Sequence, residues 1–261
     1  MNDLFLNTAI QAVENSGHIL IDYFGMLHDS RQKNENFRDL ITEVDLLVEE
    51  SIRERISSDF PSHSIIGEEK GTEHHGSDYC WYIDPIDGTV NYSQGIPHCA
   101  ISVGLEHKGE VIVGVVFNPF TEELFFASKG NGAFLNGKKI HVSNKKSIKE
   151  GLFVAAFSSE TSDEKIKEYR IFGEINDASR GVLRFGSAAL SLAYLACGRI
   201  DGFWAKDLKS WDLAGGIVLV SEAGGSCTNI DNKNYRFDSE VLVSSNSLVH
   251  ILLLKKLNGL V

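Results

Sequence analysis

The stretch Tyr82-Ile83-Asp84-Pro85-Ile86-Asp87-Gly88-Thr89 places two carboxylates close together, one on each side of a proline. Residues 79–83, which lead into it, are mostly apolar and predict a strand. An acidic residue that leaves a strand into a tight turn is presented at the edge of the sheet, where active sites form in α/β proteins. Asp84 and Asp87 are therefore candidate functional residues. The alternative is a structural turn in which they only cap the backbone.

The residues beside these two acids favour a ligand. Pro85 stiffens the predicted turn, and Gly88 lets the backbone approach a ligand closely. If Thr89 begins a short helix, its N–H group and that of Gly88 point outward, an arrangement that binds phosphate at helix N-termini. The stretch therefore predicts an anion site next to a pair of acids.

Three other acidic segments each have a structural interpretation as well. Gly67-Glu68-Glu69 follows a predicted strand at 64–66 and, taken alone, is an exposed acidic turn. Asp39-Leu-Ile-Thr-Glu-Val-Asp45 contains Thr42 at capping-box spacing from Asp45, so Asp45 could serve only to satisfy a helix start. In Trp211-Asp212 the aspartate precedes an apolar helix pattern and is a candidate N-cap.

Taken together, four acids from these segments supply the oxygen ligands that Mg²⁺ prefers. A cluster of them would hold two or three Mg²⁺ ions, which would clamp a phosphate and lower the pKa of a water molecule for in-line attack. The His74-His75 and His98-Cys99 pairs have surface and core interpretations, so they do not suggest a softer metal. The four acids are Glu68, Asp84, Asp87 and Asp212.

The composition is that of a globular chain with an acidic surface. Of 261 residues, 43% are hydrophobic, and 25 Lys plus Arg stand against 36 Asp plus Glu, which gives a net charge of −11. This charge repels phosphate, so direct binding of nucleic acid or of an anionic membrane is not expected. The first thirty residues lack Lys and Arg, no apolar run approaches the ~20 residues of a membrane span, and the four cysteines show no CxxC spacing. We expect a cytoplasmic protein with reduced thiols.

Apolar periodicity predicts interleaved helices and strands, which indicates a layered α/β or α+β class. We expect two packed halves, with 1–145 carrying most of the acids and 146–261 carrying Asp212. Helices are expected at 6–24, 44–56, 163–172, 187–197, 213–223 and 248–257. Strands are expected at 64–67, 79–83, 100–105, 111–117, 123–127, 152–157, 202–205 and 241–244, with a hairpin turn at Asn136-Gly137.

Three common hydrolase motifs are not fulfilled. The segment Gly132–Lys139 nearly matches a P-loop, but Lys139 stands where Ser or Thr must bind Mg²⁺, which favours a hairpin. Pro85 occupies the position of the nucleophilic aspartate in phosphatases of the haloacid-dehalogenase type. A Gly-x-Ser-x-Gly elbow is absent from the sequence. The residues therefore indicate metal ligands without an activated nucleophile.

Asp84-Pro-Ile-Asp-Gly-Thr89, taken with Trp211-Asp-Leu-Ala-Gly-Gly216 and Glu222-Ala-Gly-Gly225, resembles the inositol monophosphatase family, in particular its bacterial inositol-1-monophosphatases. Gly67-Glu-Glu69 and the 39–45 segment follow the same order, so the resemblance covers almost the whole chain. It implies a five-layer α-β-α-β-α sugar-phosphatase fold. It also implies a Mg²⁺-dependent phosphomonoesterase for inositol monophosphate or a similar small polyol phosphate, usually a homodimer and inhibited by Li⁺.

The resemblance implies three kinds of site residue. The metal ligands are Glu68, Asp84, the carbonyl of Ile86, Asp87 and Asp212. The residues that act on the attacking water are Glu68, Thr89 and Asp45. The substrate contacts are the N–H groups of Gly88 and Thr89 on the phosphate, and Gly186, Ser187, Ala188 and Asp212 on the alcohol side. No covalent intermediate is implied.

Two positions depart from the family pattern. Members that recognise inositol well carry a Glu seven residues before the Trp-Asp aspartate, and here that position is Ala205. The family's Lys ahead of the 39–45 segment is matched by Asn34, with Lys33 beside it. The loss of a hydrogen-bonding partner weakens discrimination for inositol but leaves the metal ligands intact. Candidate substitutes for the missing Glu are Lys206, Asp207 and Lys209.

Other functions remain open at the level of sequence. Fructose-1,6-bisphosphatase and 3′(2′),5′-bisphosphonucleotide phosphatase share the metal site within the wider superfamily. A non-enzymatic alternative is an interaction module in transcription-associated complexes. The intact set of acids argues against a purely non-catalytic protein, because buried acids without metals would repel one another.

Overall fold

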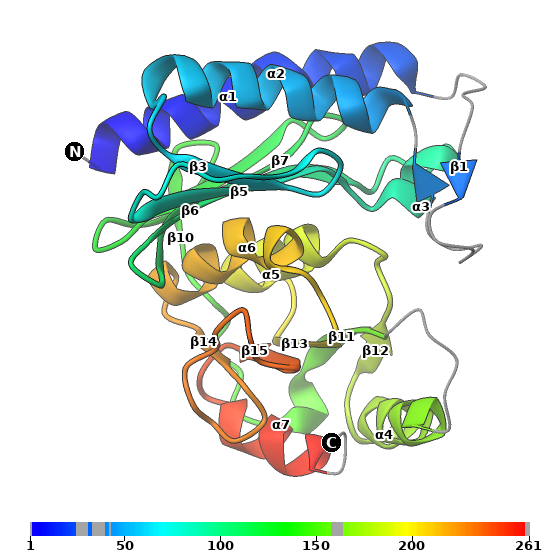
Figure 1. The fold of residues 1–261 in the computed structure, drawn as a ribbon. Coiled ribbons are helices and arrows are strands. Elements are labelled where there is room, and N and C mark those ends of the chain that lie inside the picture. The colour runs from blue at the N-terminus through cyan, green and yellow to red at the C-terminus, as the bar shows by residue number, and fades with distance from the viewer. Residues whose placement is uncertain (1, 25–30, 33–39, 42, 158–163, 259–261) are drawn as a thin grey trace.

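A computed structural model of the chain describes residues 2–24, 31–32, 40–41, 43–157 and 164–258, and its elements stack in layers (Figure 1). Two helices cover the outer face of an eight-stranded sheet, two lie between this sheet and a five-stranded sheet, and two cover the far face of the smaller sheet. These pairs are α1 (Asn2–Tyr23) with α2 (Glu43–Asp59), α5 (Ala188–Ala196) with α6 (Ser210–Glu222), and α4 (Glu164–Ala178) with α7 (His250–Leu257). The predicted α-β-α-β-α fold is confirmed.

The larger sheet has the strand order β10-β9-β8-β7-β6-β5-β3-β4. β3 and β5 run parallel, and the other neighbours run antiparallel. Its strands are β3 (Ser64–Gly67), β4 (Gly71–Glu73), β5 (Tyr79–Asp87), β6 (Ala100–His107), β7 (Glu110–Asn118), β8 (Glu123–Ser128), β9 (Gly132–Leu135) and β10 (Lys138–Ile140). A separate ribbon pairs β1 (Arg31–Gln32) with β2 (Leu40–Ile41).

The smaller sheet has the order β12-β11-β13-β15-β14. β11 runs parallel to both of its neighbours, and β15 runs antiparallel to both of its own. Its strands are β11 (Leu152–Ala156), β12 (Gly181–Leu183), β13 (Gly202–Lys206), β14 (Ser226–Thr228) and β15 (Val241–Ser245), and the 3₁₀ helix η1 (Ile148–Glu150) precedes them. The two sheets therefore draw their strands from residues 64–140 and 152–245; the division into halves near residue 145 stays a prediction.

Three apolar cores lie between the layers. One joins α1 and α2 to the larger sheet, one surrounds α5 and α6 between the two sheets, and one lies under α4 and α7. The apolar face predicted for the second helix is confirmed, since each of its residues is fully buried: Val44, Val48, Ile52 and Ile56.

Other local predictions can be compared with the structure directly. Leu135 pairs with Lys138, so Asn136 and Gly137, both at positive φ, form the predicted two-residue hairpin turn. The segment with near P-loop spacing is thus the β9–β10 hairpin. All four cysteines are free thiols. Among the helices of the described ranges, none is long and apolar enough to cross a membrane.

The helix α6 lies directly on the larger sheet because side chains are missing where the two meet. A Cβ on Gly104 of β6 would lie 2.5 Å from the Cβ of Ala214. A Cβ on Gly215 would lie 2.5 Å from the hydroxyl oxygen of Ser102 in β6. Glycine permits such close approach of backbone to backbone. The Ala-Gly-Gly run of the Trp-Asp segment therefore sets the height of α6, and with it Asp212, above the sheet.

Candidate active site

Asp84 and Asp87 lie on one strand, β5, and are separated by a bulge. β5 pairs with β6 at Asp84↔Ser102 and again at Asp87↔Ala100, with a shift of register between these pairs. The prediction that this strand ends before Asp84 is therefore wrong. The bulge takes up Pro85, which has no N–H group for the ladder, and pairing then resumes. Both carboxyl groups are buried in consequence.

The N-terminus of α5 binds the carboxylate of Asp87. The Ser187 hydroxyl donates to its Oδ2, and the N–H groups of Ala188 and Ala189 donate to Oδ1 at 3.0 Å and Oδ2 at 2.8 Å. Ser187 is also the N-cap of α5, and its hydroxyl oxygen accepts a hydrogen bond from the Leu190 N–H at 3.2 Å. A helix N-terminus favours a negative charge. The structure thus brings the predicted residues Ser187 and Ala188 into contact with Asp87.

Gly88 and Thr89 begin the short helix α3 (Thr89–Ser93), as predicted. Gly88 is the N-cap with a φ of 103°, a left-handed conformation that suits glycine. A Cβ there would lie 3.2 Å from the carbonyl oxygen of Gly186, so two predicted substrate contacts meet. The Thr89 hydroxyl donates to the carbonyl oxygen of Ile86 at 3.0 Å.

Asn91 connects the two sides of this region, and the sequence reasoning missed it. Its amide nitrogen donates to the carbonyl oxygens of His98 and Phe185, both at 2.8 Å. The same nitrogen would lie 3.0 Å from a Cβ on Gly186. An asparagine amide can donate two hydrogen bonds, so a single side chain joins α3 to the loop before α5. Its position in the sequence, two residues after the candidate site residue Thr89, is the signal that could have identified it.

Glu68 lies in the loop of the β3–β4 hairpin. Gly67 pairs with Gly71, and three residues close the hairpin between them. The Glu68 N–H donates to the carbonyl oxygen of Ile83 on β5 at 3.2 Å. β3 and β5 are parallel neighbours, so their carboxyl ends lie at the same edge of the sheet. This places Glu68 next to the start of the Asp84 bulge.

Asp212 is the third residue of α6 and not its N-cap, so that interpretation is corrected. The helix begins at Ser210 with Lys209 as the N-cap, and the Lys209 N–H donates to Asp212 Oδ2 at 2.7 Å. The start before Leu213 was missed because Lys209 is an unusual cap residue. The Asp212 side chain satisfies a donor of the helix start and lies half-buried over the sheet.

Burial and the charges of neighbouring acids raise the pKa values of Asp84, Asp87 and Asp212. Burial, followed by the charges of Glu68, Asp87, Asp212 and Asp45, holds the pKa of Asp84 well above its usual range. Burial raises the pKa of Asp87 to about 6, although the hydrogen bonds from the start of α5 lower it. Burial, with the charges of Asp87 and Glu68, raises the pKa of Asp212 to about 8. Acids from four segments therefore share one electrostatic environment.

The chemistry of these donors fits a divalent cation. Buried carboxylates that repel one another are stabilised by protons or by a bound cation, and oxygen donors suit Mg²⁺. Within the described ranges, no group of three His, Cys, Asp or Glu side chains already stands at metal-ligating geometry. The carboxylates of Asp87 and Asp212 accept hydrogen bonds from backbone N–H groups instead.

Asp45, which is predicted to act on the attacking water, is fully buried in the first turn of α2. Its charge contributes to the raised pKa values of Asp84 and of Tyr92 in α3. Asp45 is thus close to the other acids in space. The neighbouring residues of interest that lie outside the described residues are Lys33, Asn34, Asp39 and Thr42.

Comparison with known proteins identifies the family. The chain matches the model of the inositol monophosphatase family over residues 1–261. The chain belongs to this family. It is 38% identical over 247 residues to the inositol-1-monophosphatase of Rhizobium meliloti, which covers 92% of this chain and 91% of the relative. With the fructose-1,6-bisphosphatase/inositol-1-monophosphatase of Aquifex aeolicus it shares 35% identity over 251 residues, or 96% and 94% of the two chains.

A solved structure supports the same conclusion. The extragenic suppressor protein suhB from Bartonella henselae is 32% identical to this chain and superposes with a TM-score of 0.91, covering 98% of both chains. Membership of the inositol monophosphatase family makes the chain a phosphatase, a hydrolase of phosphate esters.

In this inositol monophosphatase family member, the position of the expected Glu belongs to the core. Ala205 of β13 is fully buried and packs in the apolar cluster around α5 and α6. Of the candidate substitutes, Lys206 is buried and pairs with Glu240 at 2.9 Å. Lys209 is close enough to Asp212 for its charge to lower the pKa of that acid. Lys209 therefore acts electrostatically on an acid of the predicted site.

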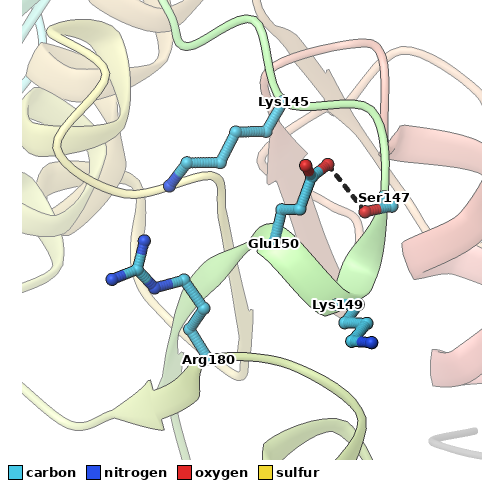
Figure 2. Close-up of a pocket in the computed structure, with 5 residues that line it drawn as sticks. All are labelled: Lys145, Ser147, Lys149, Glu150 and Arg180. Atoms are coloured by element: carbon cyan, nitrogen blue, oxygen red, sulfur yellow. Dashed lines mark hydrogen bonds between the residues drawn. The ribbon is translucent and has the colours of Figure 1, made fainter.

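A separate hollow of about 620 Å³ is shown in Figure 2. Its lining residues are Lys145, Ser147, Lys149, Glu150 and Arg180. Lys145 is neutralised by the buried Asp201 at 2.9 Å, and the Ser147 hydroxyl donates to Glu150 at 2.8 Å. With a single acid among its lining residues, this hollow does not provide the oxygen donors that the family's chemistry calls for.

Proposed function

We propose that this phosphatase depends on Mg²⁺ and hydrolyses inositol monophosphate or a similar small polyol phosphate. The observation that carries the proposal is electrostatic. Asp84 and Asp87 of β5 share a buried environment with Asp212 of α6, and besides burial the charge of Asp87 raises the pKa values of both Asp84 and Asp212. Such an arrangement costs free energy unless a cation or protons neutralise it, which is why a metal site is the function it favours.

The metal ligands are assigned around Asp84, because the charges of the other acids all act on its carboxyl group. Glu68, Asp84 and the carbonyl oxygen of Ile86 would hold one ion, and Asp84, Asp87 and Asp212 would hold a second. Glu68 would reach a third ion through water. Bound Mg²⁺ supplies positive charge that attracts the phosphate oxygens and favours ionisation of the attacking water.

Thr89 and Asp45 orient the attacking water, and the carboxylate of Asp45 takes up its proton. The Thr89 hydroxyl donates to the carbonyl oxygen of Ile86, so its lone pairs remain to accept a hydrogen bond from that water. Asp45 is the buried carboxylate to which the proton then passes. The water oxygen bonds to phosphorus as the bond between phosphorus and the alcohol oxygen breaks, and the alkoxide that leaves takes up a proton from solvent water. No covalent intermediate is formed.

The substrate is held from two sides. The N–H groups of Gly88 and Thr89 bind the phosphate, which the left-handed conformation of Gly88 supports. Gly186, Ser187 and Ala188 line the alcohol side; because the Ser187 hydroxyl is engaged with Asp87, Ser187 contributes its backbone there.

Ala205 removes the hydroxyl-binding carboxylate that inositol-selective members of the family carry, so we propose a phosphatase that accepts several polyol phosphates. Fructose-1,6-bisphosphate and 3′(2′),5′-bisphosphonucleotides are the alternative substrates. The Aquifex aeolicus relative named for two substrates is consistent with such breadth.

Further properties belong to the same proposal. We propose a cytoplasmic homodimer that is inhibited by Li⁺ and that binds neither membranes nor nucleic acid directly. The non-enzymatic alternative, an interaction module in transcription-associated complexes, would leave the shared acids without a purpose. A variant with Asp87→Asn that retains full cellular function would favour that alternative.

Phosphate release with and without Mg²⁺ tests the proposal. The panel is inositol-1-phosphate, fructose-1,6-bisphosphate and 3′-phosphoadenosine 5′-phosphate at matched concentrations, with the Asp212→Asn variant as the inactive control. We expect Mg²⁺-dependent release, fastest from inositol-1-phosphate. Faster release from another ester keeps the mechanism and changes the substrate. No release from any of the three contradicts the proposed function.

A further inference from the structure

A buried ion pair on α2 lies against the loop that carries Glu68. Glu49 is fully buried, and the Nε of Arg53 donates to its Oε1 at 2.7 Å from one turn further along the helix. Arg53 is also buried. Two buried charges lose their hydration, so their attraction is sufficient only when other hydrogen bonds satisfy them as well. Here those hydrogen bonds connect the ion pair to the β3–β4 hairpin.

The hydrogen bonds to Glu49 come from the hairpin loop. The Glu69 N–H donates to its Oε2 at 2.7 Å, and the Lys70 N–H donates to its Oε1 at 3.1 Å. The strand that enters the loop is in contact too, since a Cβ on Gly67 would lie 2.2 Å from Glu49 Oε1. Backbone donors bound to a carboxylate form strong, charge-assisted hydrogen bonds. The carboxylate of Glu49 therefore fixes the two backbone positions that follow Glu68.

Arg53 fastens the other end of the loop. Its Nη2 donates to the carbonyl oxygen of Gly71, the first residue of β4. Its Nη1 pairs with Glu73 at 3.5 Å. The planar guanidinium thus contacts Glu49 and β4 at the same time, which the single ammonium group of a lysine does not reproduce.

We propose that Glu49 and Arg53 are positioning residues that hold the 67–71 loop so that Glu68 faces Asp84. Glu68 is enclosed between Gly67, which touches Glu49, and Glu69, whose N–H is bound by it. The inference rests on the proposed function, in which Glu68 is a metal ligand. Loss of a group that orients a metal ligand through a hydrogen bond or contact typically lowers metal affinity by about 10–100-fold, so the effect is measurable.

The test compares Glu49→Gln with Glu50→Gln. Glu50 is the exposed neighbour on α2 and pairs with Lys70 of the same loop, so its variant makes the same charge change and alters the loop only at the surface. The first readout is the hydrogen–deuterium exchange of the Glu69 and Lys70 amides in the metal-free protein. The second is the dissociation constant for Mg²⁺, measured by titration calorimetry without substrate.

For Glu49→Gln we expect the two amides to exchange about 10–100 times faster, because a hydrogen bond to a charged group is lost. We expect the dissociation constant for Mg²⁺ to rise by about 10–100-fold. Glu50→Gln should match the wild type in both readouts. Faster exchange with an unchanged dissociation constant would overturn the proposal. A wild type that binds no Mg²⁺ would instead contradict the proposed function.

A second variant covers the case in which Glu49→Gln does not fold. Arg53→Lys keeps the charge of the pair but loses the fork that reaches Gly71 and Glu73. It should weaken Mg²⁺ binding in the same direction while the neighbouring Glu54→Gln, an exposed change on the same helix, does not. An Arg53→Lys protein with the Mg²⁺ affinity of the wild type would overturn the proposal.

Discussion

A Cβ atom on Gly114 of β7 would lie 2.2 Å from the carbonyl oxygen of Gly215 in α6. The obstacle is helix backbone, which cannot rotate aside as a side chain can. The helix can therefore lie at this height because position 114, like position 104, has no side chain. This contact sets the separation between the sheet that carries Asp84 and the helix that carries Asp212.

We predict that Gly114→Ala lowers both stability and activity. Overpacking of this kind typically costs about 1–3 kcal/mol in free energy of unfolding, and here the helix backbone has to move to relieve it. That movement carries Asp212 away from the other acids, so phosphatase activity should fall by more than the loss of folded protein explains. Urea unfolding and kcat, measured on the same preparation, check both effects.

The control is a glycine with open space around it. A Cβ on Gly173 in α4 meets no other atom within 4 Å. Gly173→Ala should stabilise the protein by up to about 1 kcal/mol, since alanine favours the helix, and should leave the activity unchanged. A Gly114→Ala protein as stable as this control would contradict the packing argument.

Asp212→Asn should abolish turnover while the metal-free protein keeps its fold. The asparagine carbonyl can still accept the hydrogen bond from the Lys209 N–H, and the repulsion with Asp87 disappears. Circular dichroism and the midpoint of thermal unfolding check the fold, and phosphate release checks the turnover. Near-wild-type turnover would remove Asp212 from the proposed ligands.

Asp87→Asn should also abolish turnover, but with a cost in stability. Asp87 accepts hydrogen bonds from the Ser187 hydroxyl and from the N–H groups of Ala188 and Ala189. An amide group presents an NH₂ to some of these donors, and leaving a buried donor unsatisfied costs about 1–3 kcal/mol. A thermal midpoint below that of Asp212→Asn is the expected result. Equal midpoints would show that the start of α5 does not depend on this carboxylate.

The metal-free protein should lose stability as the pH rises. The folded-state pKa values of Asp87, about 6, and of Asp212, about 8, lie above the ordinary value of 3.8. The folded protein therefore holds protons that the unfolded chain has released, and this contribution to stability is complete below about pH 4 and is lost as the pH passes through about 6 and about 8.

Mg²⁺ should reverse this loss, because it binds the ionised carboxylates. The increase in Tm on adding Mg²⁺ to chelator-treated protein should therefore be larger at about pH 8 than at about pH 5. Thermal unfolding at both pH values, with and without Mg²⁺, gives the comparison. The same increase at both would argue against these acids as the metal ligands.

Thr89→Ala should lower kcat by a factor on the order of 10²–10⁴ and change KM little, as expected when a group that positions a proton transfer is removed. Thr89→Ser keeps the hydroxyl that bonds to the Ile86 carbonyl and should restore most of the rate. An alanine variant with unchanged kcat would remove Thr89 from the mechanism.

Most elements could be predicted from periodicity and turn residues, whereas the order of the five layers was implied by the resemblance to the family. The stripe of Val44, Val48, Ile52 and Ile56 identifies a helix with one buried face, and Asn136-Gly137 identifies a hairpin. Both are local patterns that tertiary packing leaves unchanged. The acids of the candidate site were found for a related reason, because Glu68 follows the apolar strand β3 and Asp84 follows the apolar run at 79–83.

Features that depend on tertiary contacts could not be predicted in the same way. The bulge in β5 exists because β6 offers a partner on both sides of Pro85. The role of Asn91 in joining α3 to the loop before α5 depends on the carbonyl groups of His98 and Phe185, and Phe185 is far away in the chain. Glu49 and Arg53 did leave a signal, since a charged pair one turn apart lies beside the apolar stripe of α2, but its partner loop is visible only in the fold.

The hydrogen bonds from the start of α5 to Asp87 have a consequence for the folding of the chain during synthesis. The carboxylate and its donors are separated by 100–102 residues, so the larger sheet is synthesised before the helix that donates hydrogen bonds to one of its acids. Contacts of such long range form late, because the intervening chain has to be closed first. During synthesis, the strand that carries Asp87 is therefore complete before the donors to its carboxylate exist, and this carboxylate gains its hydrogen bonds only when α5 packs onto the larger sheet.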